Sequence, residues 1–325
     1  MKKLLKFLFA LVIFAIGAWQ TTSLVKADDW STPVMTLGTS LTQTQKNGTM
    51  DVLSSAIHNN PSQKMTIDGD TLVKYLNPGG DHFTSASGVW SSALIEKTDK
   101  GSGINVQILK YNGKNNITTI TADQYKNAAL TAGITDANIY VTSATPIDGS
   151  GALAGVYAAY AKNGDSLNQK QVTAAQNEMG TLSNINQQNK GQSGYSDAQL
   201  NNAVAQAKAE MAKVGPNITN QQITNIVNTE IKNNNLQNTI NDNQKNQIIN
   251  ILISVRDSGA LKDGSFKGQS NKLSGNIMNQ AKGIFNKINT PQNQNLLQRI
   301  WNSIYNFFSG LFGGNSNNNS QNQQS

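Results

Sequence analysis

The chain has 325 residues, of which 26 are basic and 19 acidic, and it contains no cysteine. Without cysteine it cannot form disulfides, thiolate metal sites or a lipid-modified N-terminal cysteine, and it has no cysteine nucleophile. The length is enough for one large or two ordinary domains.

The first 27 residues have the features of a secretory signal peptide. Lysines among the first six residues precede a thirteen-residue apolar run, 7–19, and small residues then lead to a cleavage position after Ala27. The run is shorter than the roughly 20 apolar residues that a bilayer span needs, so cleavage is favoured over a retained anchor. We therefore expect a mature protein that is secreted or non-covalently associated with the cell surface.

Removal of this peptide changes the charge of the chain. It takes away four lysines and no acid, leaving 26 − 4 = 22 basic against 19 acidic groups, a net charge of +3. No cluster of basic residues follows, although such a cluster is typical of nucleic-acid binding. Nucleic acid is therefore not an expected partner.

Residues 32–165 alternate strand and helix patterns, which predicts an α+β domain with a mixed sheet. Near its start, "PVMTLGT" and "KMTIDGD" have the pattern of strands, and the residues between them, 40–57, have that of a helix. A helical turn or two follows at 71–76. The runs in "WSSALIEKTDKGSGINVQILKYN", joined by the glycine-bearing "DKGSG", predict a β-hairpin.

The second part of this domain predicts two further helices and a strand. Thr121 and Gln124 form a capping box at the start of a helix that Gly133 ends. "ANIYVTSA" is the next strand, and "TPIDGSGALAGVYAAY", 145–160, turns from it into an Ala-rich helix.

Residues 166–312 predict an all-helical domain. From residue 181 onward, 49 of 145 residues are Asn or Gln, and apolar residues recur at helical spacing after caps at Ser196, Thr219, Asn241 and Thr290. Asn is disfavoured in helices by roughly 0.7 kcal/mol relative to Ala, so packing must hold these helices. A prion-like tract is the less favoured alternative. The polar tail, 313–325, predicts disorder.

The glycines of 145–160 could suggest a phosphate-binding loop. Gly149, Gly151 and Gly155 are spaced G-x-G-x-x-x-G, whereas a dinucleotide fold needs G-x-G-x-x-G, and Val156 stands where a phosphate loop needs lysine. We interpret Gly149 and Gly151 as a tight turn and Gly155 as a point of close packing of the helix on the sheet. No cofactor is expected.

Several stretches resemble one known family. The run "ITADQYKNAALTAGITDANIYVTSATPIDGSGALAGVYAAY" is similar to the YpuA-like family of exported proteins of Gram-positive bacteria, as are "VMTLGTSLTQTQ" and "SSALIEKTDKGSGINVQI". "DNQKNQIINIL" and the last apolar helix resemble the C-terminal half of that family. The resemblance implies an exported two-part protein and brings no activity, because the function of the family is unknown.

Acidic residues and histidines offer few candidates for a metal or catalytic site. Asp68, Asp70, Asp81 and His82 are the one cluster, and they lack the spacing of a calcium loop, so turn chemistry is favoured over a metal site.

A Ser or Thr nucleophile would need a base, and the sequence provides only His58, at a predicted helix end, and His82. Glu96, Asp99 and Asp123 could supply the acid pair of a hydrolase, but their spacing does not select them. No catalytic, cofactor-binding or metal residue is assigned.

The last predicted helix has a broad apolar face with Asn, Gln and Ser opposite. The face comprises Leu297, Ile300, Trp301, Ile304, Phe308, Leu311 and Phe312. The favoured interpretation is that it completes the core of the helical domain; the alternative is an interfacial anchor at a membrane surface or in a partner's groove. Arg299 is the one charge on the polar face, so attraction to anionic lipid would be weak.

The sequence thus predicts an exported, non-enzymatic binding or structural component of the cell envelope, with wall polysaccharide or a membrane surface as the expected partner. Amide side chains donate and accept hydrogen bonds with little dependence on pH or salt, which suits contact with polysaccharide. A secreted carboxylate-dependent hydrolase of envelope polymers and a self-assembling protein at the membrane surface are the alternatives.

Overall fold

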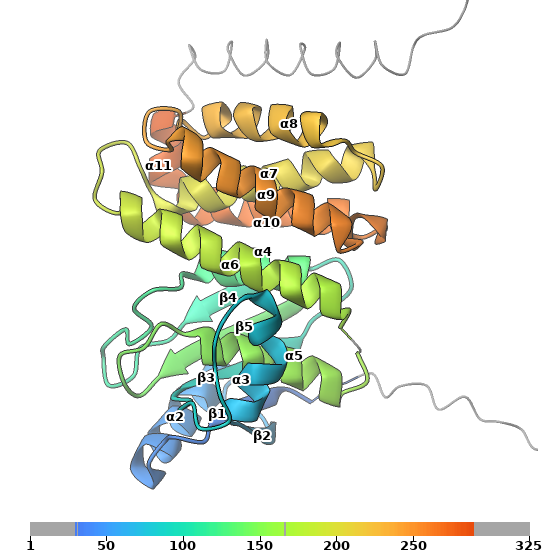
Figure 1. Cartoon of the computed structure of the whole chain (residues 1–325). Helices are drawn as coiled ribbons and strands as arrows, with labels where there is room; N and C mark the ends of the chain where they lie inside the picture. Colours follow the sequence, from blue (N-terminus) through green and yellow to red (C-terminus); the bar gives the residue numbers. More distant parts are fainter. Residues whose placement is uncertain (1–29, 31, 166, 289–325) are drawn as a thin grey trace, which may run out of the picture.

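A computed structural model of the chain describes residue 30 and residues 32–165 and 167–288. A five-stranded mixed sheet with its helices occupies the N-terminal half, and a series of helices follows, which confirms the predicted α+β class (Figure 1). The first half comprises β1 Val34–Gly38, α2 Gln43–Ala56, β2 Gln63–Ile67, α3 Gly69–Tyr75, β3 Ser91–Lys97, β4 Ile104–Ile108, α4 Ala122–Thr131, β5 Ala137–Ser143 and α5 Ser150–Lys162. The second comprises α6 Gln169–Asn189, α7 Asp197–Val214, α8 Asn220–Asn233, α9 Asp242–Asp257, α10 Phe266–Gln280 and α11 Lys282–Ile288.

The predicted hairpin of β3 and β4 is wrong. The strand order is β2-β1-β3-β5-β4, so β5 lies between them, antiparallel to β3 and parallel to β4. The turn that was expected to join the two strands is fastened to the start of β5 instead. The Asp136 carbonyl accepts the N–H of Thr98 at 2.8 Å, and its side chain accepts the N–H of Gly103 at 2.8 Å. A mostly buried strand such as β5 must pair on both edges, and this position satisfies both.

Helices cover the sheet unequally. Among the described helices, α2 packs on one face, over a small cluster of Met35, Leu37, Leu53, Ile57, Leu94 and Tyr140. Helices α3, α4 and α5 contribute to the larger core on the other face.

Helix α5 lies very close to the sheet. A Cβ added at Gly155 would lie 2.5 Å from Thr36 Oγ1, and one at Gly151 would lie 2.9 Å from Ser91 Oγ. Gly149 has a φ of 108°, which favours glycine at the turn. The interpretation of Gly149 as a turn position and of Gly155 as a packing position is confirmed. Gly151, which was also assigned to the turn, lies instead within α5, where it is a second point of close packing on the sheet.

Three helices of the helical half begin at the predicted caps. Ser196, Thr219 and Asn241 are the N-caps of α7, α8 and α9, and Thr121 caps α4. Many amides of this half form hydrogen bonds between helices. Asn202 Nδ2, for example, donates to Asn234 Oδ1 at 2.7 Å, and both residues are buried. Paired amides of this kind fix the register of neighbouring helices.

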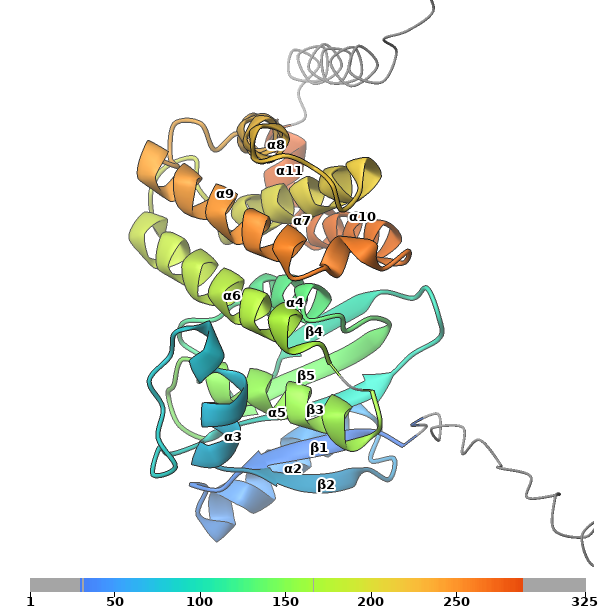
Figure 2. The same ribbon diagram turned by 45° about the vertical axis from the view of Figure 1, so that its right-hand side comes forward.

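Helix α4 joins the two halves. It lies against the sheet and also against α6 and α7, while α8 is farther from the sheet (Figures 1 and 2). One connected cluster of buried apolar side chains runs from Ile139 in β5 to Leu200 in α7. The domain boundary at 165/166 stays a prediction. The predicted signal peptide 1–27, the predicted cap at Thr290 and the tail 313–325 lie outside the described residues.

Candidate functional site

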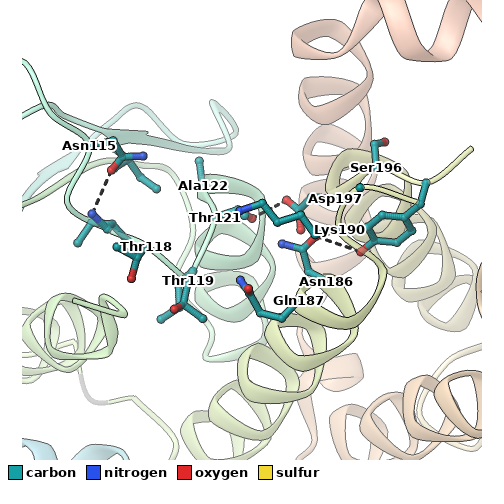
Figure 3. A pocket seen from close by; sticks show the side chains of 15 residues that line it. Asn115, Thr118, Thr119, Thr121, Ala122, Asn186, Gln187, Lys190, Ser196 and Asp197 are labelled. Atoms are coloured by element: carbon teal, nitrogen blue, oxygen red, sulfur yellow. Dashed lines mark hydrogen bonds between the residues drawn. The ribbon is translucent and has the colours of Figure 1, made fainter. Parts of the chain in front are cut away.

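A pocket of about 410 Å³ opens where the loop before α4 meets the end of α6 and the start of α7 (Figure 3). Its lining consists mainly of hydroxyl, amide and aliphatic side chains. The residues are Ile108, Asn115, Ile117, Thr118, Thr119, Ile120, Thr121, Ala122, Asn186, Gln187, Lys190, Gly191, Tyr195, Ser196 and Asp197. This set is called the α4–α7 pocket.

The loop that forms one wall is held in place from below. Asn116, which is buried, donates its amide to the Ser143 carbonyl at 2.9 Å, and Ile117 pairs with Ile147. Ile117 and Ile120 are each 5% exposed and form an apolar base, which leaves Thr118 and Thr119 toward the opening. The wall is therefore a fixed surface that carries hydroxyl groups.

Asp197 is the central charged group of the pocket. It is the first residue of α7, and its carboxylate bridges to α4. Oδ2 accepts from Thr121 Oγ1 at 2.6 Å, and Oδ1 accepts from Gln124 Nε2 at 3.1 Å and from Asn201 Nδ2 at 2.9 Å. A carboxylate has about four acceptor positions, so one position on Oδ2 remains for a ligand donor. Burial raises the pKa of Asp197 to about 6, against the opposing effect of these hydrogen bonds.

The opposite wall comes from α6 and the loop after it. The Tyr195 hydroxyl donates to Asn186 Oδ1 at 3.2 Å, which fixes both side chains. Lys190 and Gln187 are exposed, and their side chains make no hydrogen bond or ion pair to residues that the structure describes. Figure 3 shows Asn186, Gln187 and Lys190 facing the wall that carries Thr118 and Thr119. The free polar groups are thus directed to the opening.

A buried polar network supports the pocket from behind. Gln124 accepts from Ser183 Oγ at 2.9 Å, and Asn127 donates to Asn201 at 3.1 Å. Lys208 Nζ donates to the Asn127 carbonyl at 2.9 Å.

The network ends in an ion pair between fully buried side chains. Lys208 Nζ lies 2.5 Å from Glu178 Oε1, and Thr131 Oγ1 donates to Glu178 Oε2 at 2.5 Å. Burial raises the pKa of Glu178 and lowers that of Lys208, and each is opposed by the charge of the other. Because buried polar groups are costly when unpaired, the network fixes α4, α6 and α7 relative to one another.

The acidic cluster predicted from the sequence does not line the pocket. Asp68 is the N-cap of α3, Asp70 accepts from Ser85 Oγ, and Asp81 accepts from Gln176 Nε2 at 2.6 Å. His82 is exposed. Across the described ranges there is no group of three or more acidic or histidine side chains that could hold a metal ion. Asp68 thus has a local structural role as the cap of a helix, whereas Asp70 and Asp81 bond to residues distant in sequence.

At the start of α5, the backbone N–H groups already donate to a carboxylate of the chain. Asp148 Oδ1 accepts the N–H groups of Gly149 at 2.7 Å and of Ser150 at 3.3 Å, and the Tyr125 hydroxyl donates to the Gly149 carbonyl at 2.6 Å. An anion at this helix start would compete with the carboxylate of Asp148.

The remaining acidic candidates are dispersed. Glu96 accepts from Asn138 at 3.0 Å on the sheet, Asp99 lies in the turn after β3, and Asp123 pairs with Lys126 at 2.8 Å. His58 is exposed after the end of α2.

Thr121 and Gln124, the two residues of the capping box predicted from the sequence, both donate to the central carboxylate. Asp197, Asn186, Lys190 and Tyr195 were missed. The available signal was a pair of similar helix starts, "TADQ" and "SDAQ", and their proximity depends on tertiary packing.

The apolar face of the last predicted helix lies outside the described residues. It comprises Leu297, Ile300, Trp301, Ile304, Phe308, Leu311 and Phe312. Among the described helices, none combines the length and the apolar character needed to cross a bilayer.

Comparisons with known proteins identify the family. The chain is 28% identical over 284 residues to the uncharacterized protein YpuA of Bacillus subtilis (strain 168), which covers 85% of this chain and 89% of that relative. No solved structure matches the chain. The family described as a protein of unknown function (DUF1002) matches residues 37–274, a range that contains most of the sheet and most of the helical half. The chain therefore belongs to this family of unknown function, in agreement with the resemblance to YpuA-like proteins.

Proposed function

We propose that the chain is an exported, non-enzymatic protein that binds polysaccharide of the cell envelope through the α4–α7 pocket. The observation that carries the proposal is the lining of the pocket: hydroxyl and amide groups, together with the Lys190 ammonium, surround an aliphatic base and one carboxylate with a free acceptor position. Sugars present hydroxyl and acetamido groups, which donate and accept hydrogen bonds, together with apolar ring faces. This combination of groups complements the lining.

Export is part of the proposal and rests on the sequence features of residues 1–27. The absence of cysteine agrees with a chain whose stability comes from its cores and not from disulfides. An envelope polymer would be accessible to such a protein.

Binding of the mature chain to isolated cell walls and to a glycan array tests the proposal. Gln187→Ala should weaken retention because the exposed amide faces the opening and makes no hydrogen bond within the described part of the chain. Asp197→Asn should weaken it further, because a charged acceptor is lost. Asp242→Asn is the matched control, since Asp242 is the first residue of α9, as Asp197 is of α7, and is exposed. Failure of the unsubstituted chain to bind either walls or glycans would refute the proposal.

A hydrolase is the second candidate, and the raised pKa of Asp197 favours it. A carboxyl with a pKa of about 6 can act as a general acid near neutral pH. Among the described residues that line the pocket, Asp197 is the one carboxyl group, whereas glycoside hydrolysis needs two. New reducing ends released from wall polysaccharide by the mature chain, and lost in Asp197→Asn, would establish this function.

Attachment to the envelope through the C-terminal segment is a separate part of the proposal. Fractionation among medium, wall and membrane should compare the mature chain with a version that ends at residue 288. Loss of retention on truncation would make the face at 297–312 an attachment device. An unchanged location with a lower melting temperature would make it part of the core, and dispersal of an oligomer would support self-assembly.

A further inference from the structure

We propose that the ligand is an extended chain of sugars that crosses Tyr195 and occupies a second hollow beside the α4–α7 pocket. This inference rests on the proposed function and specifies its ligand as a linear oligosaccharide. The basis is that two hollows share one wall.

The second hollow has a volume of about 730 Å³ and lies where the start of α7 meets α10 and α11. Tyr195 and Ser196 line both hollows, so they form the wall between them. Each volume is within the range of about 300–1,000 Å³ that small-molecule sites have. A ligand that fills both must be elongated and must pass this wall.

The second hollow is lined by the same kinds of groups as the first, namely amides and aliphatic side chains. Asn235 is exposed and has a φ of 56°. Gln280 Oε1 accepts from Lys126 Nζ at 2.7 Å, which leaves its Nε2 group to donate. Ala281 and Ile284 are half-buried and add apolar surface. Amide groups beside small aliphatic surface again suit the acetamido and hydroxyl groups of a sugar.

Tyr195 is held in a defined position between the hollows. Its hydroxyl donates to Asn186 on the pocket side, and its ring is half-buried. A fixed aromatic ring loses little side-chain entropy on binding and offers an apolar surface on which a sugar ring can lie. The same ring can therefore contact a sugar at the junction of the two hollows.

The length dependence of binding tests this inference. The probes are β-1,4-linked N-acetylglucosamine oligosaccharides, a disaccharide and a hexasaccharide, titrated calorimetrically into the mature chain. The hexasaccharide should bind at least about tenfold more tightly, because it adds contacts in the second hollow. Asn235→Gly removes one amide and suits the positive φ. It should weaken hexasaccharide binding about three- to tenfold, the effect of one hydrogen bond, and leave the disaccharide unchanged.

Asn112→Gly is the matched control, because Asn112 is also exposed with a φ of 48° and lines neither hollow. It should change neither affinity. Equal affinity for the two oligosaccharides, with no effect of Asn235→Gly, would overturn the extended site and leave binding at the α4–α7 pocket intact. Failure of both oligosaccharides to bind, together with failure of the wall and glycan-array tests, would overturn the proposed function as well.

Discussion

The buried pair of Glu178 and Lys208 leads to a quantitative prediction about stability. Both side chains are fully buried, and the ammonium group is the cation in contact with the carboxylate. In Lys208→Met, folding must either bury an unpaired carboxylate or protonate it. Protonation is the cheaper route, and its cost sets the size of the effect.

The cost follows from the pH and the ordinary pKa of 4.5 for a glutamate. At 1.36 kcal/mol per pH unit, protonation of Glu178 costs about 3.4 kcal/mol at pH 7 and about 0.7 kcal/mol at pH 5. The first figure agrees with the roughly 3–5 kcal/mol expected when one partner of a buried pair is removed. The pKa of Glu178 is raised in the folded variant. The variant therefore keeps its stability below about pH 4.5, and its free energy of unfolding falls as pH rises above that value.

Urea unfolding of the mature chain at pH 5 and pH 7, followed by fluorescence, measures this effect. The loss in Lys208→Met should be about 3 kcal/mol greater at pH 7 than at pH 5, in addition to a pH-independent loss from its hydrogen bonds to Asn127. Adding Glu178→Gln should restore most of the loss at pH 7, because no buried charge remains. Lys170→Met, at an exposed position in the first turn of α6, is the control and should change stability by less than about 0.5 kcal/mol. An equal loss at pH 5 and pH 7 in Lys208→Met, or one below about 1 kcal/mol at pH 7, would refute the reasoning.

Three further predictions concern packing and protonation. Gly155→Ala should lower the free energy of unfolding by about 1–3 kcal/mol, because its Cβ would lie 2.5 Å from Thr36 Oγ1. Gly180→Ala is the control, because Gly180 lies in α6 with open space around the added Cβ, and it should raise the free energy of unfolding by up to about 1 kcal/mol. Equal effects of the two substitutions in urea unfolding would contradict the close packing of α5 on the sheet. Burial raises the pKa of Glu230 to about 7 in the folded chain. The contribution of this group to the stability of the folded chain is therefore fully present below about pH 4.5 and is lost as pH rises through 7. The free energy of unfolding of Glu230→Gln should therefore exceed that of the original chain by up to about 3 kcal/mol at pH 8 and should equal it at pH 4. An equal increase at both pH values would exclude proton linkage. Glycan affinity should fall as pH falls below about 6 and be independent of pH in Asp197→Asn; a matching decline in that variant would assign the titration to another group.

Local chemistry made part of the fold predictable. Capping boxes at Thr121, Thr219 and Asn241 depend on residues three positions apart, and the structure has all of them. Gly149 and Gly155 were interpretable because positive φ and close approach are requirements that glycine meets.

Strand pairing was not predictable in the same way. The runs at β3 and β4 are adjacent in sequence, and a glycine turn between such runs favours a hairpin. The structure inserts β5 because a strand from farther along the chain pairs with both, an arrangement held by Asp136. The competition between a local and a distant partner depends on the burial of the whole sheet.

The candidate site depended on tertiary structure for the same reason. Thr121 and Asp197 are 76 positions apart, and each belongs to an ordinary helix start. Their contact exists because α4 packs against α7 and the buried chain of polar groups through Asn127, Lys208 and Glu178 fixes that packing.

By itself, the sequence determined where helices begin, where glycine is needed and that the chain is of the α+β class, because these follow from short-range geometry and the periodicity of apolar residues. It also carried the family resemblance. The tertiary structure alone decided the order of the strands, the burial of many amides and the assembly of the α4–α7 pocket. Each of these depends on free energies of burial and pairing between residues far apart in the chain, which no local pattern records.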